Sequence, residues 1–239
     1  MLFFYIRHGD PIYNPDSLTA LGHEQAEAIK YRLAQHGLDR IFSSSSNRAL
    51  LTAKPTAELL KKEIEVLDWC HEEYAWQDFS MADDKNYYTW SYNHPHIKKL
   101  YMSDEIRMMG RNWYDHEAFN GTKIKEGTLR VEREVDALLL SLGYRNDRDA
   151  GYYIAENPTN DRIALFAHEG FGTAFLSALL DVPYPIYSTH FTMCHTGMTV
   201  ISFEPEKDGV VFPKVLTLSS DSHIYASRLP TRYNNGIPF

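Results

Sequence analysis

The sequence of 239 residues contains only two cysteines, Cys70 and Cys194. Two cysteines are too few for the disulfide framework that stabilises small secreted proteins, and free thiols in a reducing compartment are the simpler interpretation. No residues near them have the spacing of metal ligands. We therefore expect neither a disulfide bond nor a metal site.

Positive charge is also scarce. The chain has 24 Lys and Arg against 32 Asp and Glu, which gives a net charge of -8. An acidic surface repels phosphate backbones, so we expect no nucleic-acid partner. A small phosphorylated ligand is not excluded, because a few arginines that converge locally are enough to bind it.

Long hydrophobic runs are missing as well. No apolar run reaches the ~18 residues needed to cross a bilayer, so we expect no membrane partner. Residues Leu2 to Ile6 have the pattern of a buried strand rather than that of a signal peptide. We expect a cytoplasmic protein, and the sequence does not indicate its oligomeric state.

Strand and helix patterns alternate along most of the chain. This alternation predicts an α/β fold, a three-layer sandwich in which a mainly parallel sheet carries helices on both faces. Strands are predicted at Leu2–Ile6, Asp39–Ser43, Ile64–Leu67, Arg162–Ala167, Met198–Phe203 and Val210–Leu218. Helices are predicted from Thr19 to Gln35, from Asn47 to Lys61, from Gly127 to Leu142 and after His168.

The alternation stops between Tyr74 and Glu126. This segment has no clean period and is rich in aromatic residues, among them Trp76, Tyr87, Tyr88, Trp90, Tyr92, Trp113 and Tyr114. It is too aromatic for a disordered linker. We interpret residues 1–239 as a single domain with an aromatic insertion at about 74–126, whose side chains form a lid or wall over the ligand pocket.

Cationic and imidazole side chains stand at three places where a strand ends and a helix follows. These places are Arg7-His8-Gly9, Arg48 and His168-Glu169-Gly170. In open α/β sheets, ligands bind at the carboxyl ends of the strands. If the three strands are neighbours, two arginines and two histidines meet in one pocket. Arginine forks and a helix N-terminus bind phosphate, and a neutral imidazole can attack phosphorus.

These segments resemble the histidine phosphatases, also called the phosphoglycerate-mutase-like superfamily, over nearly the whole chain. The matching elements are Arg7-His8-Gly9, the helix start with Leu18, Thr19, Gly22, Gln25 and Ala26, the run with Ser44, Arg48, Ala49, Thr52 and Ala53, and His168. The resemblance implies that His8 is the phosphorylated nucleophile. It also implies that Arg7, Arg48 and His168 hold the phosphoryl oxygens and that no metal or organic cofactor takes part.

The resemblance also implies a general acid after the third strand. Within Asp68-Trp69-Cys70-His71-Glu72-Glu73 we favour Glu72, because some relatives have a glutamate three residues after a tryptophan. Glu73 is the alternative and Asp68 is a more distant one.

Further residues are candidates for phosphate binding. Asn14 follows His8 by six residues, where some relatives use an amide. For Glu169 we expect the side chain to point away from the pocket, while its backbone N–H and that of Gly170 serve the phosphate. The roles of His94, His96, His116 and His223 are left open, although the first three lack metal-ligand spacing and His223 fits structural packing.

The sequence thus predicts a phosphomonoesterase that acts through phosphohistidine on a small phosphorylated metabolite. Two alternatives remain. One is a mutase that returns the phosphoryl group to a phosphoglycerate, and the other is a non-catalytic phosphate-binding protein with the same fold. A pure binding protein needs no nucleophile, which argues against the second alternative.

Overall fold

Six strands form the central sheet of the computed structural model, which describes residues 1–83 and 85–234. In spatial order these strands are β13 (Lys214–Ser220), β11 (Met198–Ser202), β1 (Leu2–Arg7), β10 (Arg162–Ala167), β4 (Arg40–Ser44) and β5 (Ile64–Leu67). The four strands from β1 to β5 are parallel, and β11 and β13 run antiparallel to their neighbours. Residue 84 of the expected insertion and the last five positions of the expected domain lie outside the described residues.

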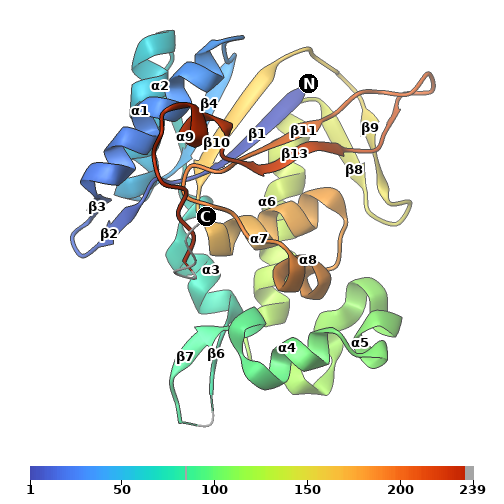
Figure 1. Ribbon diagram of the computed structural model, residues 1–239. Coiled ribbons are helices and arrows are strands. Elements are labelled where there is room, and N and C mark those ends of the chain that lie inside the picture. The colour runs from blue at the N-terminus through green and yellow to red at the C-terminus, as the bar shows by residue number, and fades with distance from the viewer. Residues whose placement is uncertain (84, 235–239) are drawn as a thin grey trace.

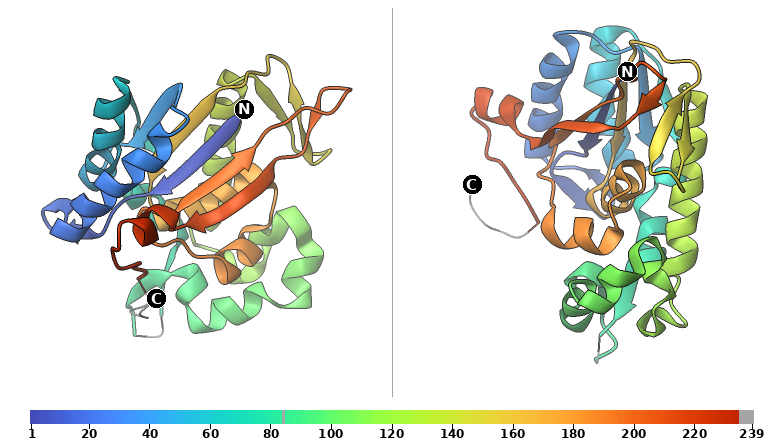
Figure 2. Two further views of the ribbon diagram at one scale, coloured as in Figure 1. Left: turned by 45° about the horizontal axis from the view of Figure 1, so that its top comes forward. Right: turned by 90° about the vertical axis from the view of Figure 1, so that its right-hand side faces the viewer.

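Helices cover both faces of this sheet (Figures 1 and 2). One layer contains α1 (Ala20–Ala34), α2 (Asn47–Leu60) and α9 (Ser222–Ala226), and the other contains α3 (Glu72–Phe79), α6 (Ile124–Ser141) and α7 (Glu169–Leu180). Alternate side chains of β1 serve the two layers, since Phe4 and Ile6 pack on the α1 side and Phe3 and Tyr5 on the α7 side. The predicted three-layer α/β sandwich is confirmed.

The capping residue and the glycine in the sequence predicted the two ends of the first helix correctly. The Thr19 hydroxyl accepts a hydrogen bond from the Gly22 N–H at 3.0 Å, which caps α1, and Gly37 follows the helix with φ of 74°. The prediction of one late strand over Val210–Leu218 is wrong. Proline lacks the N–H that a ladder needs, and Pro213 separates β12 (Val210–Val211) from β13.

The segment between β5 and α6 folds into short elements that lie below the sheet in Figure 1. After η1 (Asp68–Cys70) and α3 come β6 (Ser80–Ala82), β7 (Tyr88–Trp90), η2 (Ser91–Asn93), α4 (Pro95–Tyr101), α5 (Asp104–Met109), η3 (Gly110–Asp115) and η4 (Glu117–Phe119). Its buried residues Tyr101, Trp113 and Phe119 belong to the same hydrophobic cluster as Phe175 of α7. Helix α6 begins at Ile124, three residues before its predicted start.

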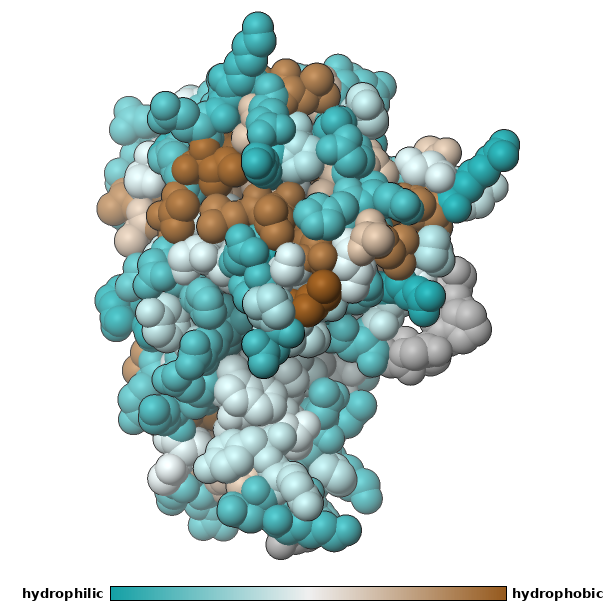
Figure 3. Space-filling view, turned by 90° about the vertical axis from the view of Figure 1, so that its left-hand side faces the viewer, coloured by the Kyte–Doolittle hydropathy of each residue, from teal (hydrophilic) through white to brown (hydrophobic). Residues whose placement is uncertain are grey.

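Several short elements complete the fold. They are the hairpin β2 (Pro11–Tyr13) and β3 (Asp16–Leu18), the strands β8 (Tyr144–Asp147) and β9 (Tyr152–Ala155), which form a small sheet with β12, and the helix α8 (Tyr184–His190). On the side of the molecule shown in Figure 3, hydrophobic residues form a band in the upper half, and most of the remaining surface is hydrophilic or intermediate. Within the described residues, every helix is too short or too polar to cross a bilayer.

Candidate active site

The carboxyl ends of three neighbouring strands meet at one edge of the sheet. Strand β10 lies between β1 and β4, with Arg7 opposite Ala167 and Phe166 opposite Ser43. His8 and His168 are the residues that follow β1 and β10, and their ring centroids lie 5.2 Å apart. The expected neighbourhood of the three strands is therefore confirmed.

His8 has the tautomer of a nitrogen nucleophile. Its Nδ1 lies 2.7 Å from the carbonyl oxygen of Gly9, which can only accept a hydrogen bond, so Nδ1 carries the proton and Nε2 keeps its lone pair. Burial lowers the pKa of His8 well below 6.5, and the positive charges of Arg7 and Arg48 and the neighbouring His168 ring lower it further. The ring is therefore neutral at pH 7.

Glycine is required at position 9 because the backbone there passes close to α1. A Cβ on Gly9 would lie 2.6 Å from the carbonyl oxygen of Gly22, so the constraint comes from α1 rather than from the His8 ring. The Gly9 N–H donates to the Thr52 hydroxyl at 3.0 Å, and that hydroxyl donates to the Arg48 carbonyl at 2.7 Å. Helix α2 is thereby fixed to the nucleophile loop.

The ring of His168 is held through its other nitrogen, Nε2, whereas His8 is held through Nδ1. The Ser44 hydroxyl accepts from the Ser46 N–H at 3.3 Å and lies 2.9 Å from Nε2 of His168. When this hydroxyl donates to Nε2, the imidazole proton resides on Nδ1. His168 is fully buried, and burial together with the charge of Arg48 lowers its pKa well below 6.5. The ring is therefore neutral at pH 7, and with its proton on Nδ1 it is a hydrogen-bond donor.

These pKa shifts predict how the protein responds to acid. The rings of His8 and His168 should stay neutral in the folded protein as the pH falls through 6.5, whereas in the unfolded chain they take up protons near that pH. The free energy of unfolding should therefore decrease as the pH falls below about 6.5. NMR of the imidazole protons in phosphate-free buffer tests this, and a titration midpoint near 6.5 for either ring would contradict it.

Arg48 is oriented by a carboxylate that the sequence analysis missed. Its Nη1 donates to Asp16 of β3 at 2.7 Å, and Tyr13 lies beneath the guanidinium, with its ring centroid 5.4 Å away. Asp16 also accepts from the Asn47 N–H at 2.7 Å and from the Ser46 hydroxyl at 2.9 Å. Burial would raise the pKa of Asp16, but Arg48 and Ser46 lower it below its ordinary value. One carboxylate thus caps α2 and positions Arg48.

Replacement of Asp16 should therefore affect stability and binding together. For Asp16→Ala we expect a loss of about 0.5–2 kcal/mol, as for other helix caps, and a roughly tenfold higher KM for an aryl phosphate. Asp16→Asn keeps the cap acceptor and should recover most of the stability but not the KM. Thermal unfolding and steady-state kinetics measure the two effects. A wild-type KM in both variants would show that Asp16 does not position Arg48.

The expectation for Glu169 is wrong, because its side chain turns toward Arg7. Its Oε2 lies 2.8 Å from Nη1 of Arg7 and accepts from the side-chain amide of Asn234 at 3.1 Å, while its Oε1 accepts from the Thr192 hydroxyl. Arg7 also donates to the Met193 carbonyl and, at 2.7 Å, to Oδ1 of Asn234. The cause is electrostatic, since Arg7 is buried and its charge requires a counter-ion.

Glu72 occupies the N-terminus of α7, where a free phosphate site was expected. Its Oε1 accepts from the Gly170 N–H at 3.1 Å and its Oε2 from the Phe171 N–H at 2.9 Å. The Gly170 N–H therefore positions Glu72 and does not face a phosphate, which corrects the expectation. Burial raises the pKa of Glu72 above 4.5, although these hydrogen bonds and Arg48 oppose the shift. A raised carboxyl pKa suits a proton donor.

The two alternatives for the general acid lie at the edge of the pocket beside His8 or outside it. Glu73 is exposed and lines the rim of the pocket beside His8. Asp68 accepts hydrogen bonds from Ser45 at 2.6 Å and Tyr74 at 3.0 Å, outside that pocket. Asn14 is exposed at the tip of the β2–β3 hairpin and is not among the pocket residues. Of the carboxylates proposed as the acid, Glu72 has the position that fits best.

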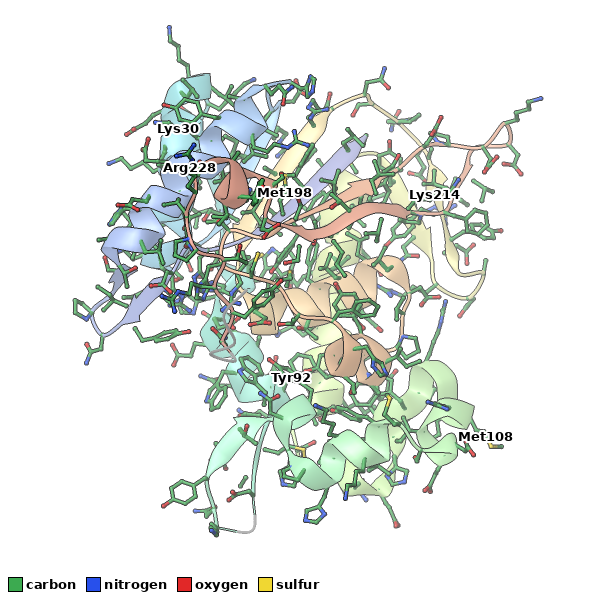
Figure 4. All side chains as sticks on the ribbon, in the orientation of Figure 1. Lys30, Tyr92, Met108, Met198, Lys214 and Arg228 are labelled. Carbon is green, nitrogen blue, oxygen red and sulfur yellow. The ribbon has the colours of Figure 1, made fainter. Side chains whose placement is uncertain are left out.

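The pocket beside His8 has a volume of about 370 Å³. Its walls contain Arg7, Tyr13, Arg48, His71, Glu72, Glu73, Trp76, Trp90, Tyr92, Glu169, Gly170 and Asn234. The inserted segment supplies Trp76 and Trp90, whose rings meet nearly at right angles with centroids 5.0 Å apart. Tyr92 lies where this segment meets α7 and α8 (Figure 4). Trp113 is buried in the core instead.

Two further residues close to the nucleophile were missed from the sequence. The ring of His195 stacks on His8 with centroids 5.9 Å apart, and its Nδ1 lies 3.1 Å from Oδ1 of Asp10. Burial lowers the pKa of His195 to about 3, so this ring is neutral. Asn234, described above, comes from the end of the chain. Neither residue belongs to a local motif, so only tertiary structure brings them to the site.

Three of the other histidines have structural partners, and the ring of His96 lies beside that of His94, with centroids 5.8 Å apart. His94 and His116 accept hydrogen bonds from the backbone N–H groups of Ile97 and Ala118, which cap α4 and η4. His223 lies 2.9 Å from the Thr196 hydroxyl, and burial lowers its pKa to about 4. Among residues 1–83 and 85–234, no cluster of three or more His, Cys, Asp or Glu side chains could hold a metal ion.

Comparison with protein-family models places most of the chain in a known family. The sequence model described as the histidine phosphatase superfamily (branch 1) matches residues 3–214. No curated protein sequence matches the chain at a significant level.

Solved structures show the same fold at low sequence identity. The chain is similar to phosphoserine phosphatase from Entamoeba histolytica in complex with 3-phosphoglyceric acid, with a TM-score of 0.58 and 20% identity over 93% of this chain and 98% of that one. It is also similar to mycobacterial glucosyl-3-phosphoglycerate phosphatase, with a TM-score of 0.58 and 19% identity over 92% and 99% of the two chains.

Proposed function

The chain belongs to the histidine phosphatase superfamily, and from this premise we propose that it hydrolyses phosphomonoesters through a phosphohistidine on His8. The catalytic residues in this proposal are His8, Glu72, His168, Arg7 and Arg48. The two similar phosphatases are named for phosphoserine and glucosyl-3-phosphoglycerate. Those names support a small phosphorylated metabolite as the substrate.

One observation carries the proposal. Three buried nitrogens near His8, the Nε of Arg7, the Nε of Arg48 and the Nδ1 of His168, have no hydrogen-bond partner among the described residues. Leaving a buried donor without an acceptor costs about 1–3 kcal/mol, so a ligand that supplies acceptors to such donors gains binding free energy. A phosphoryl group has three terminal oxygens. These nitrogens would therefore find acceptors in a phosphoryl group bound next to the His8 ring.

In the first step, the lone pair on Nε2 of His8 attacks phosphorus and the bond to the alcohol oxygen breaks. Glu72 donates its carboxyl proton to that oxygen, so a neutral alcohol leaves. The proton on Nδ1 of His8 stays in place, hydrogen-bonded to the Gly9 carbonyl. Arg7 and Arg48 compensate the charge on the phosphoryl oxygens as the transition state forms.

In the second step, water replaces the alcohol. The Glu72 carboxylate removes a proton from the water while the water oxygen attacks phosphorus and the P–N bond breaks. This returns His8 to its neutral form, returns the proton to Glu72 and releases inorganic phosphate. The two backbone N–H groups of α7 keep the carboxylate in one orientation during both steps.

Release of inorganic phosphate from an aryl phosphate tests this function directly. The proposal expects multiple turnovers, and vanadate, which resembles the pentacoordinate transition state, should inhibit. Binding of phosphate without turnover would indicate the non-catalytic alternative. Transfer only to a phosphoglycerate, with dependence on a bisphosphate primer, would indicate the mutase.

A further inference from the structure

A second cavity adjoins the phosphate pocket. It has a volume of about 440 Å³ and shares Trp90, Tyr92, Glu169 and Asn234 with the pocket beside His8. Its outer walls come from Asn93 of η2, from Lys98 of α4, from the end of α8 with the residues that follow it, and from Tyr233. Cavities of this size hold small organic ligands. The alcohol part of a phosphomonoester bound at His8 is thus adjacent to this space.

The rings of Trp90 and Tyr92 line both cavities. They lie nearly parallel, at 11° with centroids 5.8 Å apart, and both are half-buried. The tip of the Trp90 indole leaves no room for a side chain at position 170, because a Cβ there would lie 2.4 Å from it. The indole is therefore held against α7 and forms a fixed ridge beside the phosphate pocket.

The charged groups of the second cavity are unequally paired. Glu169 is fully engaged, because Arg7, Asn234, Thr192 and the Met193 N–H all contact its carboxylate. The ammonium group of Lys98 has no hydrogen bond or ion pair with any residue in the described ranges 1–83 and 85–234. Among these described residues, no carboxylate compensates its charge.

A hydroxyl in the same cavity also lacks a partner. The Oγ1 atom of Thr189 is buried and makes no hydrogen bond with the described residues. It lies at the end of α8, and α8 packs against α4, the helix that carries Lys98. An exposed ammonium and a buried hydroxyl without a partner thus line one cavity, and both are donors suited to an anion.

We propose that this second cavity binds the alcohol part of the substrate and that this alcohol carries a second anionic group, such as a carboxylate, held by Lys98 and Thr189. The proposal rests on the phosphatase function proposed above and adds the substrate class. Lys98 is then a specificity residue and takes no part in phosphoryl transfer.

The test compares substrates that differ in one carboxylate. Phenyl phosphate is paired with 4-carboxyphenyl phosphate, and glycerol 3-phosphate is paired with 3-phosphoglycerate. For each pair the preference is the ratio of the two kcat/KM values. Lys98→Ala should lower this preference about tenfold, mostly through KM, in at least one pair. The adjacent Lys99→Ala is the matched control, since Lys99 is also an exposed lysine of α4 but does not line the cavity.

Two more readouts separate recognition from indirect effects. The wild-type preference should shrink as salt is raised, because the Lys98 ammonium is exposed and salt screens its charge. Thr189→Val, which removes the hydroxyl at nearly constant volume, should lower the preference in the same pair. An unchanged preference in Lys98→Ala for both pairs, or an equal fall in Lys99→Ala, would overturn the proposal. Failure of the wild type to hydrolyse any of the four compounds would instead overturn the phosphatase function.

Discussion

His8→Ala should abolish turnover of every phosphomonoester, with a loss on the order of 10⁶-fold or to the limit of detection, as when a catalytic nucleophile is removed. The structure leaves no substitute at the same place, since Nε2 of His168 is engaged by Ser44 at 2.9 Å. His8 lies at the end of β1, between the rings of His168 and His195, and its backbone N–H bonds to the Ala167 carbonyl regardless of the side chain. The fold should therefore persist.

Circular dichroism and thermal unfolding control for the fold of this variant. If a folded His8→Ala protein keeps substantial activity and carries acid-labile phosphate, another histidine is the nucleophile, and His168 is the candidate. If the variant does not fold, His8→Asn, which keeps a side chain of similar size in the pocket, repeats the test.

Glu72→Gln should produce a loss that depends on the leaving group. Alkyl and sugar phosphates need a proton on the departing oxygen, so their reaction should slow by about 10²–10⁴-fold. Aryl phosphates leave with little help, so phosphorylation of His8 by them should slow far less. Because water activation also needs the Glu72 carboxylate, phosphoenzyme should accumulate in the variant when an aryl phosphate is used. Rapid-quench kinetics with both substrate types measure these effects.

Glu73→Gln is the matched control for this experiment. Glu73 has the same charge and lies at the rim of the same pocket, but it is exposed and shows no contact with the N-terminus of α7. It should show no dependence on the leaving group. Equal losses with both substrate types in Glu72→Gln would mean that Glu72 only orders the pocket. A leaving-group effect in Glu73→Gln would assign the acid to Glu73.

The parts of the fold that sequence alone predicted are those with strong local patterns. The strands Ile64–Leu67 and Arg162–Ala167 were predicted at their observed bounds, and the cap at Thr19 fixed the start of α1. The short elements β8, β9, α8 and α9 were missed, because four to seven residues carry too little periodicity to be recognised. Their stability comes from neighbouring segments of the chain.

The residues of the site also divide into those that local sequence patterns predicted and those that they did not. His8 and His168 directly follow strands, and Arg48 lies in the first turn of the helix after β4, so the order of the strands brings them together. Three other residues of the site come from distant parts of the chain: Asp16 from the β2–β3 hairpin, His195 from a turn and Asn234 from the C-terminal region. No spacing in the sequence predicts that they lie there. Glu169 was misjudged because the sequence does not reveal that Arg7 is buried and that its charge must be compensated.

Trapping of the phosphoenzyme tests the central claim most directly. The protein is mixed with a ³²P-labelled aryl phosphate, quenched within milliseconds and digested, and the labelled peptide is identified. Our account predicts one label, stable in alkali and lost in acid, on the peptide that contains His8, and a stronger label in Glu72→Gln. A label on any other residue, or phosphate release by a protein that never becomes labelled, would contradict it.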